Sequence, residues 1–218
     1  MGRRRSNQPA RAVRRSRQPA HRGRITARPP SAHKRRGTGR ASGPRFDAPE
    51  IWHEPRGDGD LQMIVQQPGA GYFHPITAEE VQDRIANLPV EFCEGLEYVH
   101  FSRMTRKRRL FPCYGLQWGT AVYLYPVECE LEELYLRAPS PRQRIEAEMF
   151  GGRWIEDGLQ WWLVWTESTI RDYYLNNVLI HEIGHINDCR NTRFADRERF
   201  ADWFAIEFGY RASRSRLA

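Results

Sequence analysis

The spacing of hydrophobic and polar positions predicts a folded body that begins near residue 76. Thr77 followed by Glu80 has the pattern of a capping box, and apolar residues recur at helical spacing after it. Two stretches rich in β-branched and aromatic residues, 96–101 and 120–125, are predicted strands. The first part of the body therefore combines one helix with at least two strands.

The second part of the body ends in helices. The predicted elements are a helix over 141–150, a hairpin of 153–155 and 160–165 around Asp157-Gly158, a helix from Ser168 to about Asn187, and a last helix over 197–208. This order of helix, strands and then helices predicts an α+β domain with a small mixed or antiparallel sheet. No internal repeat is visible.

Two segments precede this body. Residues 1–46 contain fifteen Lys or Arg and no Asp or Glu, and we expect them to be disordered because they have too few apolar groups to form a core. Residues 47–75 contain several Pro and Gly and are predicted to be an irregular linker. The sequence thus predicts a basic tail (1–46), a linker (47–75) and one domain (76–218).

The basic tail admits two interpretations, which the sequence leaves open. It is an electrostatic tether to nucleic acid or another polyanion, or it is a loosely constrained extension. The chain has 32 Arg and only two Lys, which fits the codon bias of a GC-rich genome. A second basic cluster also admits two interpretations, a solvated hairpin tip or an anion-binding patch. It consists of Arg103, Arg106, Lys107, Arg108 and Arg109.

Composition narrows the class of protein. The four cysteines form no C-x-x-C pair, which favours free thiols over a disulfide framework. No apolar run is long enough to cross a membrane, and no hydrophobic stretch follows the basic start as in a secretory signal. We therefore expect a cytoplasmic protein with no membrane partner.

A short motif in the helix from Ser168 carries the most specific chemistry. His181 and His185 lie one helical turn apart, so both imidazoles can bind a single metal ion. Glu182 is turned about 100° from His181 around the helix axis, where it can reach a water molecule on that ion. Two histidines and a carboxylate in this order are typical of a metal-dependent hydrolase.

A zinc site of this kind needs a third protein ligand. Twelve residues separate His185 from Glu198, which begins the pattern Glu198-Arg-Phe-Ala201-Asp202 on the last predicted helix. Small residues on this helix would let it approach the first one closely. Glu198 is the candidate third ligand, and Asp202 is the candidate acceptor for the second N–H of a ligand histidine.

These two motifs together resemble those of the gluzincin zinc metallopeptidases, whose third ligand is a Glu in an E-x-x-A/S-D helix. The resemblance covers residues 178–208, and the upstream elements are similar to small zincin domains of repressor-cleaving and stress-response peptidases. By this likeness, 120–125 would be the edge strand along which a peptide substrate binds. The metzincin pattern is not met, because Asp188 and Asn191 replace its Gly and its third His.

The resemblance implies a zinc metallopeptidase with one Zn²⁺ per chain, held by His181, His185 and Glu198. Glu182 would be the general base, and Asp202 would orient a ligand histidine. Three tyrosines are candidates for stabilising the oxyanion, without a choice among them: Tyr173, Tyr174 and Tyr210. The alternative is a nucleic-acid-associated protein that binds through the tail and has a structural or vestigial zinc site.

Overall fold

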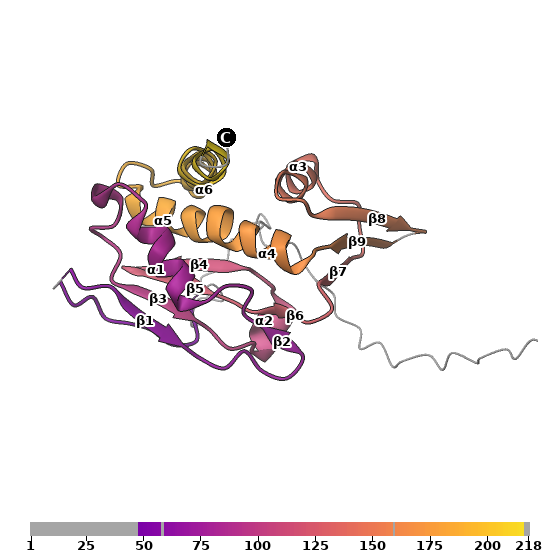
Figure 1. Ribbon diagram of the computed structural model, residues 1–218, viewed down its shortest axis with the longest axis horizontal. Helices are drawn as coiled ribbons and strands as arrows, with labels where there is room; N and C mark the ends of the chain where they lie inside the picture. Colours follow the sequence, from indigo (N-terminus) through magenta and orange to yellow (C-terminus); the bar gives the residue numbers. More distant parts are fainter. Residues whose placement is uncertain (1–47, 58, 159, 216–218) are drawn as a thin grey trace, which may run out of the picture.

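The protein has a mixed α+β fold (Figure 1). The computed structural model describes residues 48–215 except 58 and 159, so the expected disorder of 1–46 lies outside the described residues. A four-stranded sheet lies below helices α1, α4 and α5, and α6 lies above α5. A smaller sheet stands beside them with α3. The predicted α+β class is confirmed, but two strands precede the first helix.

The main sheet has the strand order β1-β3-β5-β4. β1 (Gln62–Val65), β3 (Tyr98–Phe101) and β5 (Ala121–Leu124) are parallel, and β4 (Gly115–Trp118) is antiparallel to β5 at the edge. The expectation that 120–125 is the edge strand is wrong. All four residues of β5 are buried, as in a strand that is covered on both faces, whereas those of β4 are only partly buried.

Two strands lie in the segment that was expected to be irregular. β1 pairs with β3, and β2 (Tyr72–Phe73) pairs with β6 (Val127–Glu128). Both are too short to show a hydrophobic period of their own, and their partners lie far away in the sequence. Tertiary pairing, and not local sequence, makes them strands.

The first described residues cover the lower face of the main sheet. The His53 ring stacks on Tyr98 with 4.7 Å between ring centroids, and its Nε2 lies 2.9 Å from His100 Nδ1. The backbone N–H groups of Arg56 and Gly57 donate to the Glu97 carboxylate at 2.7 Å. The segment 48–57 is thus fixed to the body and explains why β5 is buried on both faces.

The second sheet has the order β7-β9-β8, all antiparallel. It is formed by β7 (Glu132–Tyr135), β8 (Arg153–Asp157) and β9 (Gln160–Val164), and α3 (Pro141–Met149) connects β7 to β8. The predicted hairpin is confirmed, since Asp157 pairs with Gln160 and Gly158 has φ 64°. The predicted helix over 141–150 is confirmed as α3.

The core lies between the main sheet and the helices. α1 (Ala78–Ala86) begins at the predicted capping box, in which Glu80 N–H donates to Thr77 Oγ1 at 3.2 Å and Thr77 N–H donates to Glu80 at 2.8 Å. Val81 of α1 and Val122 of β5 are fully buried in this core, together with Ile183 of α5. The short helices η1 (Val90–Phe92) and α7 (Ala212–Ser215) complete the described part.

The two predicted C-terminal helices are each interrupted by a π-helical turn. The first consists of α4 (Glu167–Tyr173), η2 (Tyr174–Val178) and α5 (Leu179–Asn187). The second consists of α6 (Phe194–Phe204) and η3 (Ala205–Arg211). The cap of α4 is Thr166, two residues before the predicted Ser168.

The two π-helical turns pack against each other. A Cβ on Gly209 of η3 would lie 1.9 Å from the Asn176 carbonyl oxygen of η2. Glycine is therefore required where the two long helical segments come closest.

The Arg cluster is not the hairpin tip that was one of its two interpretations. Four of its five residues lie in α2 (Arg106–Leu110), which Thr105 caps, and Arg103 precedes this helix. Arg108 is buried. All four cysteines lie in the described part and are free thiols. No helix among the described residues has the length and apolar character that a membrane crossing requires.

Candidate metal centre

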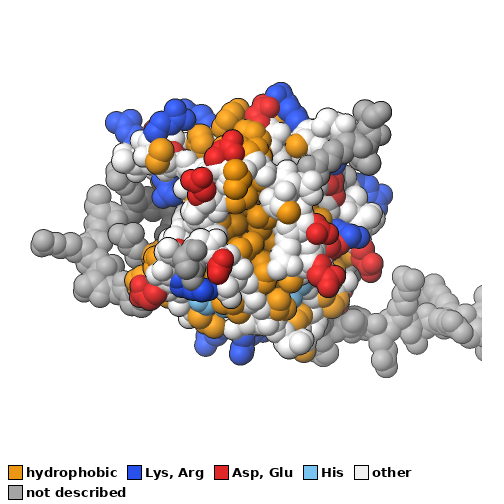
Figure 2. All heavy atoms as spheres, turned by 60° about the vertical axis from the view of Figure 1, so that its left-hand side comes forward, with side chains coloured by type: hydrophobic (Ala, Val, Ile, Leu, Met, Phe, Trp, Pro, Cys, Tyr) orange, Lys and Arg blue, Asp and Glu red, His pale blue; other side chains and the backbone are white. Residues whose placement is uncertain are grey.

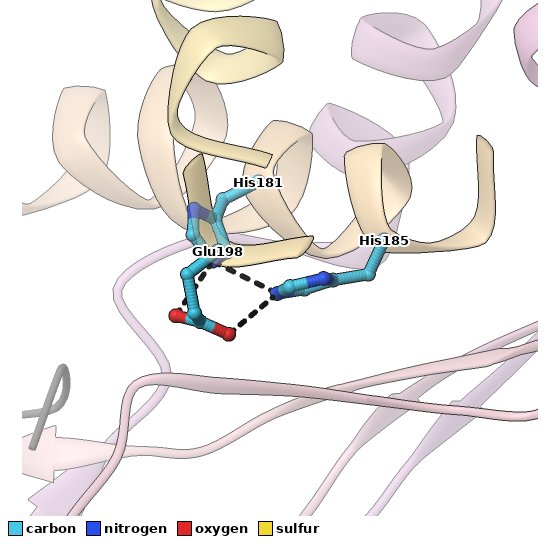
Figure 3. Close-up of side chains that lie close together, drawn as sticks. All are labelled: His181, His185 and Glu198. Atoms are coloured by element: carbon cyan, nitrogen blue, oxygen red, sulfur yellow. Dashed lines mark hydrogen bonds and ion pairs between the residues drawn. The ribbon is translucent and has the colours of Figure 1, made fainter. Parts of the chain in front are cut away.

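Three predicted ligand side chains meet between α5 and α6 (Figure 3). His181 Nε2 and His185 Nε2 are 3.1 Å apart. Glu198 points at both rings, with one carboxylate oxygen 3.3 Å from His185 Nε2 and the other 3.9 Å from His181 Nε2. The structure therefore brings together the two histidines of one helix and the glutamate of the next.

The helices can hold this arrangement because they approach closely beside the histidines. A Cβ on Gly184 would lie 3.0 Å from Phe204 Cβ and 3.1 Å from Ala201 Cα. Ala201 of α6 and Ala205, the first residue of η3, are both buried. The expectation that small residues allow the close approach is confirmed, and this approach brings Glu198 within reach of α5.

The spacing of the three ligands fits a tetrahedral metal ion. For zinc with ligand bonds of ~2.1 Å, two ligand atoms are ~3.4 Å apart. The two Nε2 atoms are 3.1 Å apart, and one Glu198 oxygen lies 3.3 Å from His185 Nε2. One ligand atom from each of the three residues can be chosen so that all three lie within 4.8 Å of one another. Two imidazoles and one carboxylate are also a donor set that zinc accepts. The residues present therefore fit a zinc ion with one position left for water.

Asp202 lies one turn after Glu198 on α6 and contacts the other nitrogen of a ligand histidine. Its Oδ1 is 3.3 Å from His181 Nδ1. The same oxygen forms an ion pair with Arg142 at the start of α3. Asp202 thus stands where the sequence predicted a partner for a ligand histidine, and α3 reaches this site through Arg142.

The charges around the histidines alter the pKa of two groups. Burial by itself would lower the pKa of His181, but the hydrogen bond with Asp202 and the nearby carboxylates raise it to about 9. Burial would raise the pKa of Glu198, but the hydrogen bond with His185 and the charge of both histidines lower it. Without a metal, protonated His181 can donate from Nδ1 to Asp202 and from Nε2 to His185.

Glu182 is buried and faces β4, and it lies close enough to the three ligand side chains for their charges to affect its pKa. A Cβ on Gly115 would lie 2.8 Å from Glu182 Cγ and Oε1, so only glycine leaves room for this carboxylate. The backbone N–H of Gln117 donates to it, and burial raises its pKa above the ordinary value. A buried carboxylate beside a metal site and an edge strand is placed to accept a proton at that point.

Other groups near the site were not found by sequence reasoning. Arg197 donates to the Gln117 side chain and to the His185 carbonyl, both at 3.3 Å, and so connects α6 with β4 and α5. Arg142 and Gly115 come from elements with no motif of their own. Both residues lie far from the ligand residues in the sequence, and no helical or strand period relates them to the ligands. Only the tertiary structure could identify them.

The three candidate tyrosines do not join the cluster of ligands. Tyr173 donates to Glu146, and Tyr174 donates to the Tyr125 carbonyl. Tyr210 packs on Phe150 with 5.3 Å between ring centroids. All three serve the packing of the core, and none is assigned to the site.

Comparisons with known proteins return no match to a family model, to a curated protein or to a solved structure. The description of the site therefore rests on its own geometry and chemistry.

Proposed function

We propose that this protein is a zinc-dependent peptidase of the gluzincin type with a zincin-like fold. The observation that carries the proposal is the meeting of His181, His185 and Glu198 beside the buried Glu182. A structural zinc site is normally closed by four protein ligands, whereas a catalytic site keeps one position open. The cluster here has three candidate ligands, and the Glu182 carboxylate lies beside it and faces β4. Both features support a catalytic zinc site over a structural one.

In this proposal, His181, His185 and Glu198 hold the ion. A zinc ion bound there supplies a water of lowered pKa and polarises the substrate carbonyl. Glu182 would accept a proton from the attacking water and donate it to the leaving amine, and its raised pKa suits both roles. Asp202 accepts from His181 Nδ1 and fixes the orientation of the ring.

β4 is the proposed alignment site for the peptide substrate. It is an edge strand, and it lies against α5 through Gly115 and Glu182. An extended peptide can pair with such an edge through backbone hydrogen bonds, whatever its side chains. In this proposal, 115–118 takes the role that was expected for 120–125.

The test replaces Glu182 with Gln and measures zinc content and hydrolysis together. The probe is a mixture of synthetic peptides whose cleavage products are identified by mass spectrometry. We expect about one zinc per chain in both wild type and Glu182→Gln, with cleavage at least about a hundredfold slower in the variant. Glu148→Gln, an exposed change on α3, is the matched control and should cleave normally.

Three results would contradict parts of the proposal. Wild-type cleavage by Glu182→Gln would remove the base assignment. Absence of zinc from the wild type, after zinc is supplied, would remove the metal site. Bound zinc without cleavage of any peptide would favour the alternative of a structural or vestigial zinc site.

A further inference from the structure

One arginine differs from the other surface cations in what it contacts. Figure 2 shows Lys and Arg side chains spread around the rim of one face of the molecule, and a solvated cation contributes little by itself. The Arg142 side chain is only 40% exposed, and its guanidinium forms an ion pair with Asp202 of α6. Arg142 thus reaches the candidate metal centre from α3, a helix that contributes no ligand.

The stability of α3 does not explain why Arg142 stands where it does. Arg142 lies in the first turn of α3, which contains no acidic residue. The amino end of a helix has a partial positive charge, so a cation in the first turn is unfavourable. Ser140 already caps this turn by accepting from the Gln143 N–H. The favourable contact of Arg142 is therefore the one outside its own helix, with Asp202.

A second residue on the same face of α3 fixes the helix beside the metal centre. Glu146 follows Arg142 by four residues, about one helical turn. Its Oε1 accepts from the Tyr173 hydroxyl and from Asn177 Nδ2, both at 2.8 Å. Asn177 precedes the ligand His181 by four residues, and Figure 1 shows α3 and α6 on the same side of the segment that α4 and α5 form. α3 therefore contacts both of the helical segments that supply the ligands.

The contacts continue from α3 to a ligand through one oxygen atom. Asp202 Oδ1 accepts from Arg142 Nη2 and lies 3.3 Å from His181 Nδ1. When His181 binds a metal through Nε2, its Nδ1 has the proton and Asp202 is the acceptor. The Asp202 side chain is 30% exposed, so without Arg142 it would be free to turn towards water.

We propose that Arg142 is a positioning residue of the metal centre, which holds Asp202 in place for His181. The inference rests on the zinc site of the proposed function and adds to it a residue from outside both metal-binding motifs. It concerns metal affinity, so its test does not require a known substrate.

A positioning role and a simple charge effect predict changes of opposite sign. Burial raises the pKa of Glu198, whereas His185, His181 and Arg142 lower it, so the charge of Arg142 acts on a ligand. A cation this close repels Zn²⁺. Charge alone therefore predicts tighter zinc binding when Arg142 is removed, and the loss of a partner that orients a ligand predicts weaker binding.

The test is competition for zinc against a chelator at pH 10, where His181, with a pKa of about 9, is mostly neutral. Arg142→Met should weaken zinc binding about fivefold to tenfold. Arg144→Met, at an exposed position of the same helix, is the matched control and should bind zinc as the wild type does. Arg142→Lys keeps a cation, since the ordinary pKa of Lys is about 10.4, and should recover part of the loss.

A second variant tests the route from Arg142 to the metal. If Arg142 acts through Asp202, adding Arg142→Met to Asp202→Ala should change zinc affinity less than about twofold, because residues in one network have non-additive effects. Urea unfolding of each variant, measured without metal, separates a loss of affinity from a loss of fold.

The inference is overturned if Arg142→Met binds zinc as tightly as Arg144→Met or more tightly, or if the loss is equally large in the Asp202→Ala background. Absence of zinc from the wild type would overturn both this inference and the proposed function. Zinc binding that depends on Arg142, without cleavage of any peptide, would contradict the peptidase proposal and support the positioning role.

Discussion

Zinc binding should become tighter as the pH rises from 6.5 to 9, because a proton occupies the place of the metal. His181 has a pKa of about 9 in the metal-free protein, and its Nε2 lies 3.1 Å from His185 Nε2. Only a neutral imidazole can bind zinc, so the proton must leave first. The perturbation is therefore a change of pH alone, with no change of sequence.

The pKa sets the size of the effect. At pH 7, two units below a pKa of about 9, roughly one His181 in a hundred is neutral, so apparent zinc affinity is reduced about a hundredfold. Affinity should rise about tenfold per pH unit up to pH 9 and then level off. The metal-free fold should show the opposite trend. A histidine pKa raised above its unfolded value of 6.5 contributes stability below pH 6.5, and about 3 kcal/mol is lost as pH rises through 9.

The assay is competition for zinc against a chelator of known pH dependence, at half-unit steps from pH 6 to pH 10. Asp202→Asn is the informative variant, since it keeps an oxygen near His181 Nδ1 but removes the charge that raises the pKa. Its affinity should level off at a lower pH than in wild type. Equal affinity at pH 6.5 and pH 9, after correction for the chelator, would refute the reasoning.

Three further predictions concern the surroundings of the site. Asp202→Ala should weaken zinc binding about 10–100-fold at pH 10, where His181 is neutral with or without Asp202 and a proton no longer competes with the metal. The same competition measures this loss, and an unchanged affinity at pH 10 would show that His181 needs no partner. Gly209→Ala should destabilise the fold by about 3 kcal/mol or more in urea unfolding, because its Cβ meets a backbone oxygen at 1.9 Å. Gly184→Ala, with contacts of 3.0 Å, should lower stability by less, and the reverse order would contradict the packing argument. Burial raises the pKa of Glu133 to about 7, so the wild type should lose about 3 kcal/mol of stability between pH 4.5 and pH 7, and this loss should be absent in Glu133→Gln.

Local sequence patterns were sufficient for the parts of the protein that depend on neighbouring residues. The capping box at Thr77 and Glu80 is formed by residues three apart, and the hairpin at Asp157-Gly158 by adjacent ones. His181 and His185 share a helix face because a step of four residues is only slightly more than one turn. The placement of Glu198 beside them followed from one more assumption, that the chain reverses once after α5.

The tertiary structure decided what depends on partners far away in the sequence. The sequence analysis took 120–125 for the edge strand, whereas 115–118 pairs with 121–124 and forms the edge itself. The residues of 121–124 do not reveal this pairing. β1 lies in a segment that was expected to be irregular, since four residues form a strand only when a neighbour supplies the hydrogen bonds. Arg142 contacts Asp202 from sixty residues away, and no local period relates the two.

The amino-acid sequence by itself thus determined the ligand types, their helical spacing and the class of fold, all of which are set by local backbone geometry. Long-range packing decided which strand borders the site, and it brought Asp202 to His181 and Arg142 of α3 to Asp202. Burial and pairing are properties of the whole chain, and a local pattern carries no information about the distant residues that complete them.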